Sequence, residues 1–329
     1  MAHQYERRSQ AESWGNWTAF SRFWTRRIFR IAPLYYLLLA IALPLGPYLG
    51  RKRIAIAAHY PDTMTNAARY TGMSVSTVAT HVSFLFGAIP RYSFQTPLPD
   101  WSIGLEMQFY FVFPFLMLFV ARFGYLAMIS VVMAFVEIGS LTAHGLYNSF
   151  PEPSFLPLRL HLFLLGMLLA AAIHGQVKRG LWIFVLGIPV IGRVAHVSGT
   201  VGMVVDIVFA ALLLVLAEKK EYSTLALAPI RRLLDTKLMQ SCGNISYSMY
   251  LVHLLFVLPI CAALLSHSWY VSLPEFLRFL LAFGASAAFV IPSSLLLHRM
   301  IEMPGAALGK RMLQSSGKTK NTQTSIDVF

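Results

Sequence analysis

The chain has 329 residues, of which 57% are hydrophobic and only 12% are charged. Soluble proteins carry about 25% charged residues, so this composition excludes a soluble globular protein. A net charge of +13 would suit nucleic-acid binding, but the basic residues fall in short loops between apolar stretches, so we expect no nucleic-acid partner. The composition predicts an all-α integral membrane protein.

Apolar stretches long enough to cross a bilayer recur along the chain. A helix needs about 20 apolar residues to span the hydrocarbon core. We predict a polytopic transmembrane helical bundle of about eight spans, at residues 31–50, 102–120, 124–143, 155–173, 180–196, 200–217, 245–265 and 276–300. The apolar segment 75–90 is shorter, so we expect a re-entrant or interfacial helix there and not a ninth span.

The predicted spans form one membrane domain at residues 31–303, between a basic lead-in at 1–30 and a polar tail at 304–329. The tail is rich in Ser, Thr, Lys and Gln and lacks apolar periodicity, which predicts disorder. Cys242 and Cys261 adjoin or lie within an apolar span. We therefore expect neither a disulfide framework nor a metal site.

Positive charge distinguishes the two sides of the predicted bundle. Lys and Arg are concentrated in the two tails and in alternate loops, whereas the loops 144–154 and 266–275 contain none. Because cytoplasmic loops carry the excess of Lys and Arg, we expect both termini on the cytoplasmic side of the inner membrane. The residues 51–53 (RKR) are the exception, since this topology places them on the outer side.

Ionisable groups inside a bilayer are costly, so each is a candidate functional residue. Glu106, Glu137, Arg159 and Asp206 fall in the outer parts of their predicted spans. At similar depth, one Arg and three carboxylates could line an outward-facing polar cavity. The alternative interpretation is an ion-pair network that only holds the helices together.

Arg27 and Arg30 stand three residues apart just before the first predicted span. On a helix these positions lie on the same face, and two guanidinium groups suit bidentate binding of a phosphate. The alternative interpretation is a basic anchor on the cytoplasmic side, which the positive-inside rule favours.

The predicted span 245–265 carries a polar face. Ser246, Tyr250 and His253 follow the spacing i, i+4, i+7 and so share one side of a helix. A buried imidazole beside hydroxyl groups can act as a general base or as a hydrogen-bonded strut. The spacing by itself favours the strut.

Five segments, in this order, resemble the acyltransferase-3 family of membrane O-acyltransferases. They are residues 26–36 (RRIFRIAPLYY), 99–110 (PDWSIGLEMQFY), 159–166 (RLHLFLLG), 243–253 (GNISYSMYLVH) and 301–305 (IEMPG). No segment is decisive by itself, but the five occur in family order across nearly the whole chain.

The resemblance implies transfer of an acyl group, often acetyl, from cytoplasmic acyl-CoA to a hydroxyl at the outer side, as in O-acetylation of polysaccharides. Acceptors in the family are glycans or small molecules, so a carbohydrate or small-molecule acceptor, acyl-CoA and membrane lipid are the implied partners. No cofactor is implied beyond the donor substrate. The family's R-x-x-R, linked to the donor, falls on Arg27 and Arg30. Its tryptophan–serine–glutamate segment falls on Trp101, Ser102 and Glu106.

The sequence departs from the family pattern at its start. Family members begin with a helix that carries an Arg and, eleven residues later, the catalytic His, and a second helix follows. Neither helix is recognisable here, and His3 precedes any span. Glu106 and His253 are then weak candidates for the base, and we expect the chain as written to lack transfer activity. A transporter or flippase of a lipid-linked sugar or small anion is the alternative function, although no duplicated halves are visible.

The charge asymmetry generates a test of topology. A single cysteine at Asn148, in a variant without Cys242 and Cys261, is expected to react with a membrane-impermeant maleimide added from the outer side. A single cysteine in the basic loop at Lys178 is the matched control and is expected to react only after the membrane is opened. Labelling of position 148 from the cytoplasmic face alone would contradict the predicted topology.

Overall fold

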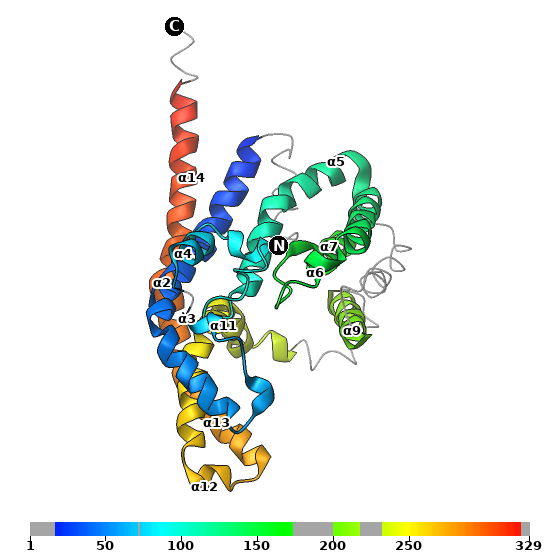
Figure 1. The fold of residues 1–329 in the computed structure, drawn as a ribbon. Helices are drawn as coiled ribbons and strands as arrows, with labels where there is room; N and C mark the ends of the chain where they lie inside the picture. Colours follow the sequence, from blue (N-terminus) through cyan, green and yellow to red (C-terminus); the bar gives the residue numbers. More distant parts are fainter. Residues whose placement is uncertain (1–16, 72, 174–199, 218–231, 324–329) are drawn as a thin grey trace. The chain divides into compact units, whose positions relative to one another are not determined.

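A computed structural model describes residues 17–71, 73–173, 200–217 and 232–323 of the chain. Every regular element among these residues is a helix (Figure 1), which confirms the all-α prediction. Within the described residues, four helices are long and apolar enough to cross a membrane: Trp17–Ala57, Trp101–Thr142, Lys237–Leu265 and Glu275–Gln314. A shorter apolar helix covers Leu156–Ala171.

Two compact units make up the chain. Unit 1 contains the start of the first long helix, Gly87–Ser93 and Trp101–Gln240. Unit 2 contains Arg22–Phe86, Phe94–Asp100 and the chain from Ser241 onward. Each unit has its own packing and is described by itself.

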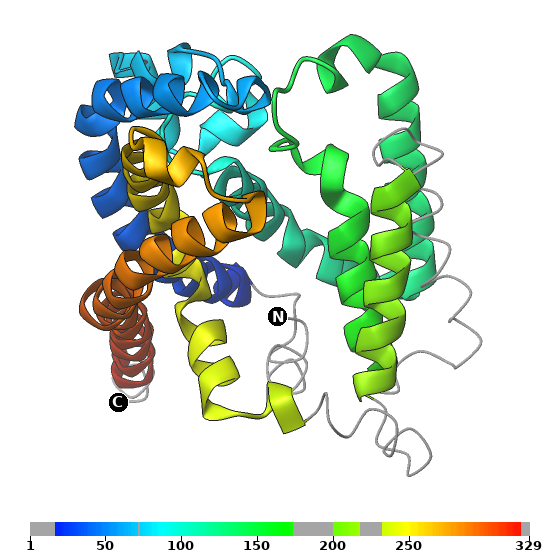
Figure 2. The same ribbon diagram turned by 90° about the horizontal axis from the view of Figure 1, so that it is seen from below.

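Unit 1 is built from α5 (Trp101–Thr142), α6 (His144–Tyr147), α7 (Leu156–Ile173) and α9 (Thr200–Ala217). Helix α7 packs against both α5 and α9, as Figure 2 also shows. Two predicted spans lie on α5, which is broken at Gly124, where φ is 83° and ψ is 168°. Glycine adopts this backbone conformation without the steric cost of a Cβ atom.

Seven of the eight predicted spans fall on helices of the structure, and the span at 180–196 lies outside the described residues. The count of eight therefore stays a prediction. The segment 75–90 forms a helix of only 8 residues, Val75–Val82. That helix extends roughly 12 Å at 1.5 Å per residue, so the prediction that this segment is not a full span is confirmed.

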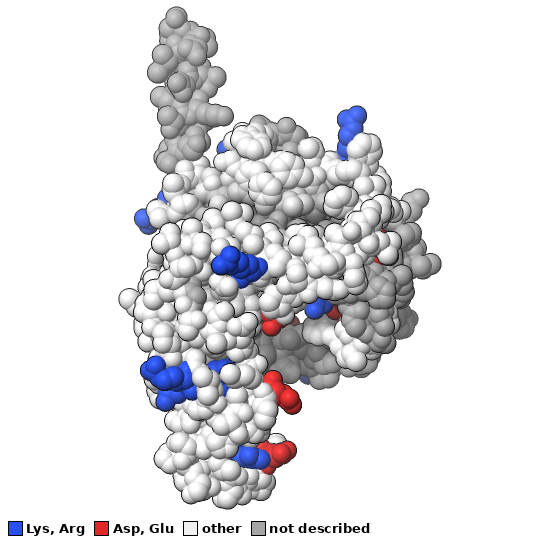
Figure 3. Space-filling view, in the orientation of Figure 1, with Lys and Arg blue, Asp and Glu red and all other residues white. Residues whose placement is uncertain are grey.

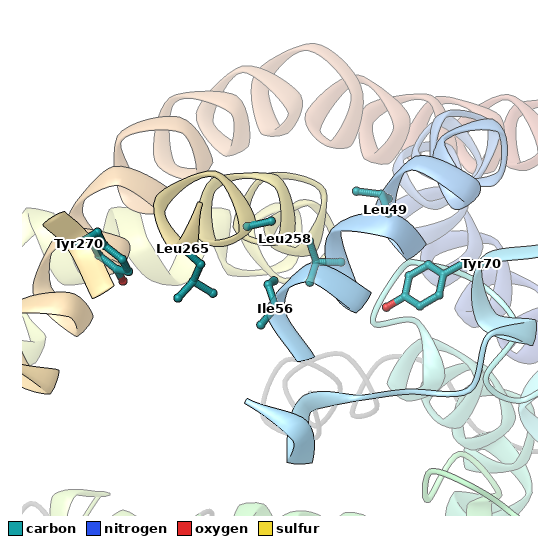
Figure 4. Packing of buried hydrophobic residues seen from close by; sticks show 7 residues of the cluster. Leu49, Ile56, Tyr70, Leu258, Leu265 and Tyr270 are labelled. Carbon is teal, nitrogen blue, oxygen red and sulfur yellow. The ribbon is translucent and has the colours of Figure 1, made fainter. Parts of the chain in front are cut away.

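Unit 2 contains most of α2 and the C-terminal helices. Its elements are α2 (Trp17–Ala57), η1 (Pro61–Thr63), α3 (Ala68–Thr71), α4 (Val75–Val82), η2 (Leu85–Ala88), α11 (Lys237–Leu265), α12 (Ser268–Val271), α13 (Glu275–Leu297), the π-helix η5 (His298–Glu302) and α14 (Met303–Gln323). Leu49 and Ile56 of α2 pack against Leu258 and Leu265 of α11 (Figure 4), which forms a buried apolar cluster.

Two helices extend past the predicted ends of the membrane domain. Helix α2 begins at Trp17, well inside the predicted lead-in, and continues past residue 50 to Ala57. Helix α14 continues through residues predicted as a disordered tail. Apolar contacts explain the start of α14, because Gly305 and Gly309 lie against Phe29 of α2.

The contact between α14 and α2 requires glycine at position 305. A Cβ atom there would lie 2.8 Å from Cγ of Pro33 and 2.9 Å from the Phe29 carbonyl oxygen. Pro33 has no amide hydrogen to offer that carbonyl four residues earlier, and the carbonyl lies against Gly305 instead. The close approach holds α14 beside the segment that carries Arg27 and Arg30.

Gly305→Ala is expected to destabilise the protein, because overpacking costs about 1–3 kcal/mol. Gly284→Ala in α13 is the matched control, since a Cβ at that glycine meets nothing within 4 Å. Melting temperatures of the two variants in detergent check this expectation. Equal melting temperatures would contradict the close packing of α14 on α2.

Candidate functional site

The two arginines of the R-x-x-R motif differ in environment. Arg27 is buried, with 6% of its surface exposed, and its guanidinium carbon lies 5.6 Å from the centre of the Phe23 ring. Arg30, one turn further along α2, is exposed. Positions i and i+3 are separated by about 60° around a helix with 3.6 residues per turn. One of them can therefore lie on the packed side of α2 while the other lies on the exposed side. Arg30 is therefore the guanidinium that faces outward from the unit.

Helix α11 is hydrogen-bonded to the same part of α2. The Tyr247 hydroxyl donates to the Ile31 carbonyl oxygen across 2.8 Å. Tyr247 belongs to the segment 243–253 and Ile31 to the segment 26–36, so the fold joins two of the five sequence segments. Gly305 adds the segment 301–305 to the same neighbourhood through its contact with Pro33.

A second polar group in unit 2 links α11 to the π-helix η5. The Ser248 hydroxyl donates to Oε2 of Glu302 at 3.0 Å, and Nδ1 of His298 lies 2.9 Å from the same oxygen. Ser248 and Glu302 are buried, with 0% and 5% of their surfaces exposed. The serine proton points to the carboxylate and not to the imidazole, so this group lacks the nucleophile–base contact of a catalytic serine.

Two of the three residues of the polar face predicted on α11, Ser246 and His253, contact carbonyl oxygens of their own helix. Nδ1 of His253 lies 2.7 Å from the Tyr250 carbonyl oxygen, and the Ser246 hydroxyl donates to the Gly243 carbonyl oxygen. These contacts are those expected of a strut. Tyr247 and Ser248, which the i, i+4, i+7 pattern did not include, are the residues that bond to other elements.

A fully buried imidazole–carboxylate pair precedes the tryptophan–serine–glutamate segment. His81 of α4 and Asp100 are 0% and 1% exposed, with Nε2 of His81 3.7 Å from Oδ2 of Asp100. Nδ1 of His81 lies 2.7 Å from the Thr77 carbonyl oxygen, which requires the proton on Nδ1. The imidazole also stacks on Phe86, with ring centres 4.3 Å apart.

Two hydroxyl groups hold the Asp100 carboxylate. Thr96 donates at 2.7 Å and Tyr35 of α2 donates at 3.1 Å, both to Oδ2. Burial raises the pKa of the Asp100 carboxyl above its ordinary value, against the opposing effects of His81, Thr96, Tyr35 and Arg69. Oδ1 of Asp100 and Nε2 of His81 have no hydrogen-bond partner among the described residues. The pair is thus a buried polar centre in which one nitrogen of His81 and one oxygen of Asp100 are left without a hydrogen bond among the described residues.

Arg69 fixes the loop that leads to Asp100. Its side chain donates to the carbonyl oxygens of Thr96 at 2.9 Å and Leu98 at 3.1 Å, and its guanidinium lies 4.0 Å from the centre of the Phe94 ring. Sequence reasoning missed His81, Asp100 and Arg69. The sequence signal that could have found Asp100 was its place directly before Trp101, inside one of the five segments that resemble the family.

In unit 1 the start of α5 is joined to the start of α7 by Gln108. The Gln108 side chain donates to the Ser154 carbonyl oxygen at 2.8 Å and accepts from the Leu156 amide at 3.0 Å. Trp101 and Ser102 lie half-buried in the first turn of α5. Glu106, one turn later, accepts a hydrogen bond from the Tyr110 hydroxyl at 3.3 Å.

The predicted acceptor-side cluster is only partly assembled by contacts in the structure. Nε2 of His161 on α7 lies 3.9 Å from Oδ2 of Asp206 on α9, and Arg159 acts electrostatically on both groups. His161 was missed by the sequence analysis. Glu137 has a buried Oε2 without a partner among the described residues. That Glu106 and Arg159 face one cavity stays a prediction, and His3 lies outside the described residues.

Comparison with known proteins identifies the family. A family model described as an acyltransferase domain matches residues 9–298. The chain therefore belongs to the acyltransferase-3 family, whose members are membrane acyltransferases. No curated protein and no solved structure matches it.

The buried position of Asp100 generates a stability prediction. Asp100→Ala removes the acceptor of the Tyr35 and Thr96 hydroxyls, and each buried polar group left unpaired costs about 1–3 kcal/mol. Asp100→Asn keeps an acceptor oxygen and is expected to cost less. The exposed Asp62→Ala is the matched control. Melting temperatures in detergent check the order, and equal melting temperatures for the Ala and Asn variants would contradict it.

Proposed function

We propose that this membrane acyltransferase moves an acyl group from cytoplasmic acyl-CoA to a hydroxyl group of a glycan or small molecule at the outer side. Acetyl is the acyl group that we propose. Membership of the acyltransferase-3 family over residues 9–298 is the observation that carries the proposal. The R-x-x-R segment of α2 and the tryptophan–serine–glutamate segment of α5 supply its two binding regions.

The donor side of the proposal rests on α2. Arg30 is exposed, and guanidinium groups bind phosphate oxygens in a planar, bidentate geometry. Arg27 is buried over Phe23, so its role is to stabilise the helix face from which Arg30 projects and to add positive potential. The phosphates of acyl-CoA are the groups that this positive helix end would attract.

The transfer step is a nucleophilic substitution at the thioester. The acceptor oxygen attacks the acyl carbon, a C–O bond forms, the C–S bond breaks, and coenzyme A leaves as the thiol after it gains a proton. A base takes the hydroxyl proton, and such a base contributes about 10²–10⁴-fold to the rate. Glu106 and His253 are the candidates that the sequence offers, with one oxygen of Glu106 accepting from Tyr110 and Nδ1 of His253 bonded within α11.

The function is tested with the purified chain in nanodiscs and radiolabelled acetyl-CoA. Donor binding, followed by release of coenzyme A when hydroxyl-bearing acceptors are added, is the result expected of an acyltransferase. Donor binding without release of coenzyme A for any acceptor would contradict transfer by this chain on its own. Movement of a lipid-linked sugar across the membrane without donor binding would contradict the proposal and favour a flippase.

Arg30→Lys is expected to weaken donor binding roughly tenfold, equivalent to about 1.4 kcal/mol, because lysine keeps the charge but loses the fork of parallel donors. Arg91→Lys, at another exposed arginine, is the matched control and is expected to leave binding unchanged. Equilibrium binding of acetyl-CoA measures both. Unchanged affinity in Arg30→Lys would show that the motif is only a cytoplasmic anchor.

A further inference from the structure

A basic cluster at the far end of α2 is left unexplained by the proposed transfer reaction. Arg51, Lys52 and Arg53 fall within the last two turns of this helix, which ends at Ala57. Arg30 and Arg51 are 21 residues apart, or about 32 Å along a helix. The hydrocarbon core of a bilayer is about 30 Å thick, so one helix carries basic residues at both membrane interfaces. The positive-inside rule accounts for only one of the two.

A pocket of about 180 Å³ lies beside this cluster, entirely within unit 2. Its lining comes from the end of α2 and from the segment that leads into α3, and consists of Pro47, Gly50, Arg51, Arg53, Ile54, Met64, Thr65, Ala67, Tyr70 and Thr71. Pockets that enclose a whole small molecule measure about 300–1,000 Å³. This one has the size of a headgroup and not of a complete ligand.

Close packing builds the wall of the pocket. A Cβ atom at Gly46 would lie 2.5 Å from the Tyr70 carbonyl oxygen, and one at Gly50 would lie 2.9 Å from Cβ of Tyr70. Two glycines one turn apart therefore let Tyr70 approach the α2 backbone. The Tyr70 hydroxyl in turn accepts from Nε of Arg53 at 3.2 Å and from Thr65 at 3.3 Å.

Within the described part of the chain, no carboxylate pairs with the two arginines that line the pocket. Arg53 also donates to the Thr63 carbonyl oxygen, so its partners are neutral. Among the residues that the structure describes, Arg51 and Arg53 form no ion pair with a carboxylate. Asp62, the acidic residue on the adjoining η1, is exposed. Positive charge in a partly apolar site without a counter-ion favours binding of an anion.

The rim of the pocket is apolar and exposed. Ile54 and Met64 leave 56% and 52% of their surfaces accessible. Figure 3 shows a mostly white surface on which Lys, Arg, Asp and Glu stand in small separate groups. A soluble anion gains nothing from such a rim, whereas the chains of an amphiphile would cover it.

We propose that this pocket binds the phosphate group of an anionic membrane phospholipid, with Arg51 and Arg53 as the phosphate ligands and Ile54 and Met64 against the acyl chains. Arg53 is held in place by Tyr70 and Thr63, and Arg51 lines the same pocket. The lipid supplies a counter-ion that the described residues do not provide and anchors the second end of α2 at its interface. The proposal is independent of the transfer reaction.

Native mass spectrometry of the full chain in detergent, titrated with phosphatidylglycerol or phosphatidylcholine, tests the proposal. The protein is expected to retain phosphatidylglycerol in preference to phosphatidylcholine. Arg51→Gln is expected to weaken this binding about tenfold, because charge-assisted bonds to phosphate are among the strongest hydrogen bonds. Lys52→Gln is the matched control, since it removes the same charge one residue away, and Lys52 lies over the Tyr48 ring and not in the pocket.

Ala67→Phe is a second variant that fills the pocket without changing charge, and Ala67 is exposed, so folding is expected to be preserved. It should weaken phosphatidylglycerol binding while leaving the melting temperature in lipid-free detergent unchanged. If Arg51→Gln and Lys52→Gln weakened phosphatidylglycerol binding equally, the binding would depend on general surface charge, and the proposal would be overturned. Unchanged binding in Ala67→Phe, or inorganic phosphate bound as tightly as the lipid, would also overturn it.

Discussion

The cost of removing polar groups from water governs this structure. In hydrocarbon each unsatisfied backbone amide or carbonyl costs several kcal/mol, so only helices or closed barrels can span a membrane. Long helices satisfy nearly all of these groups locally, and the described part of the chain contains no other regular element. A proline such as Pro33 removes one donor from this pattern. The Phe29 carbonyl, which Pro33 deprives of a donor, lies against Gly305.

The same constraint explains how buried side chains are arranged within unit 2. Glu302 accepts from Ser248 and contacts His298, and Asp100 accepts from Thr96 and Tyr35. Arg69 donates to the carbonyls of the loop before Asp100. Removal of one partner from such a group leaves a buried polar atom without its hydrogen bond, which costs about 1–3 kcal/mol. These polar centres therefore set how the helices and loops of unit 2 are aligned with one another, because hydrogen bonds need specific partners and apolar packing does not.

Charge at the ends of α2 has a different role. Arg30 is exposed in the first half of the helix, and Arg51 and Arg53 lie near its end. In the proposed topology these side chains lie close to the lipid headgroups, where positive charge attracts anions. A soluble phosphorylated donor suits the first end. A phospholipid suits the second, where the basic groups border a small pocket with an apolar rim.

The sequence by itself determined the helical class, the membrane location, the family and the positions of most described spans, because these depend on composition and on local apolar runs. It also indicated the break between the spans 102–120 and 124–143, which Gly124 provides. Only the tertiary structure decided which polar residues meet. Arg27 and Arg30 have a spacing that suits one face, yet packing buries the first and exposes the second. His81 and Asp100 are 19 residues apart in different elements, and no periodicity relates them. Contacts between elements depend on packing geometry, and a one-dimensional pattern does not contain that information.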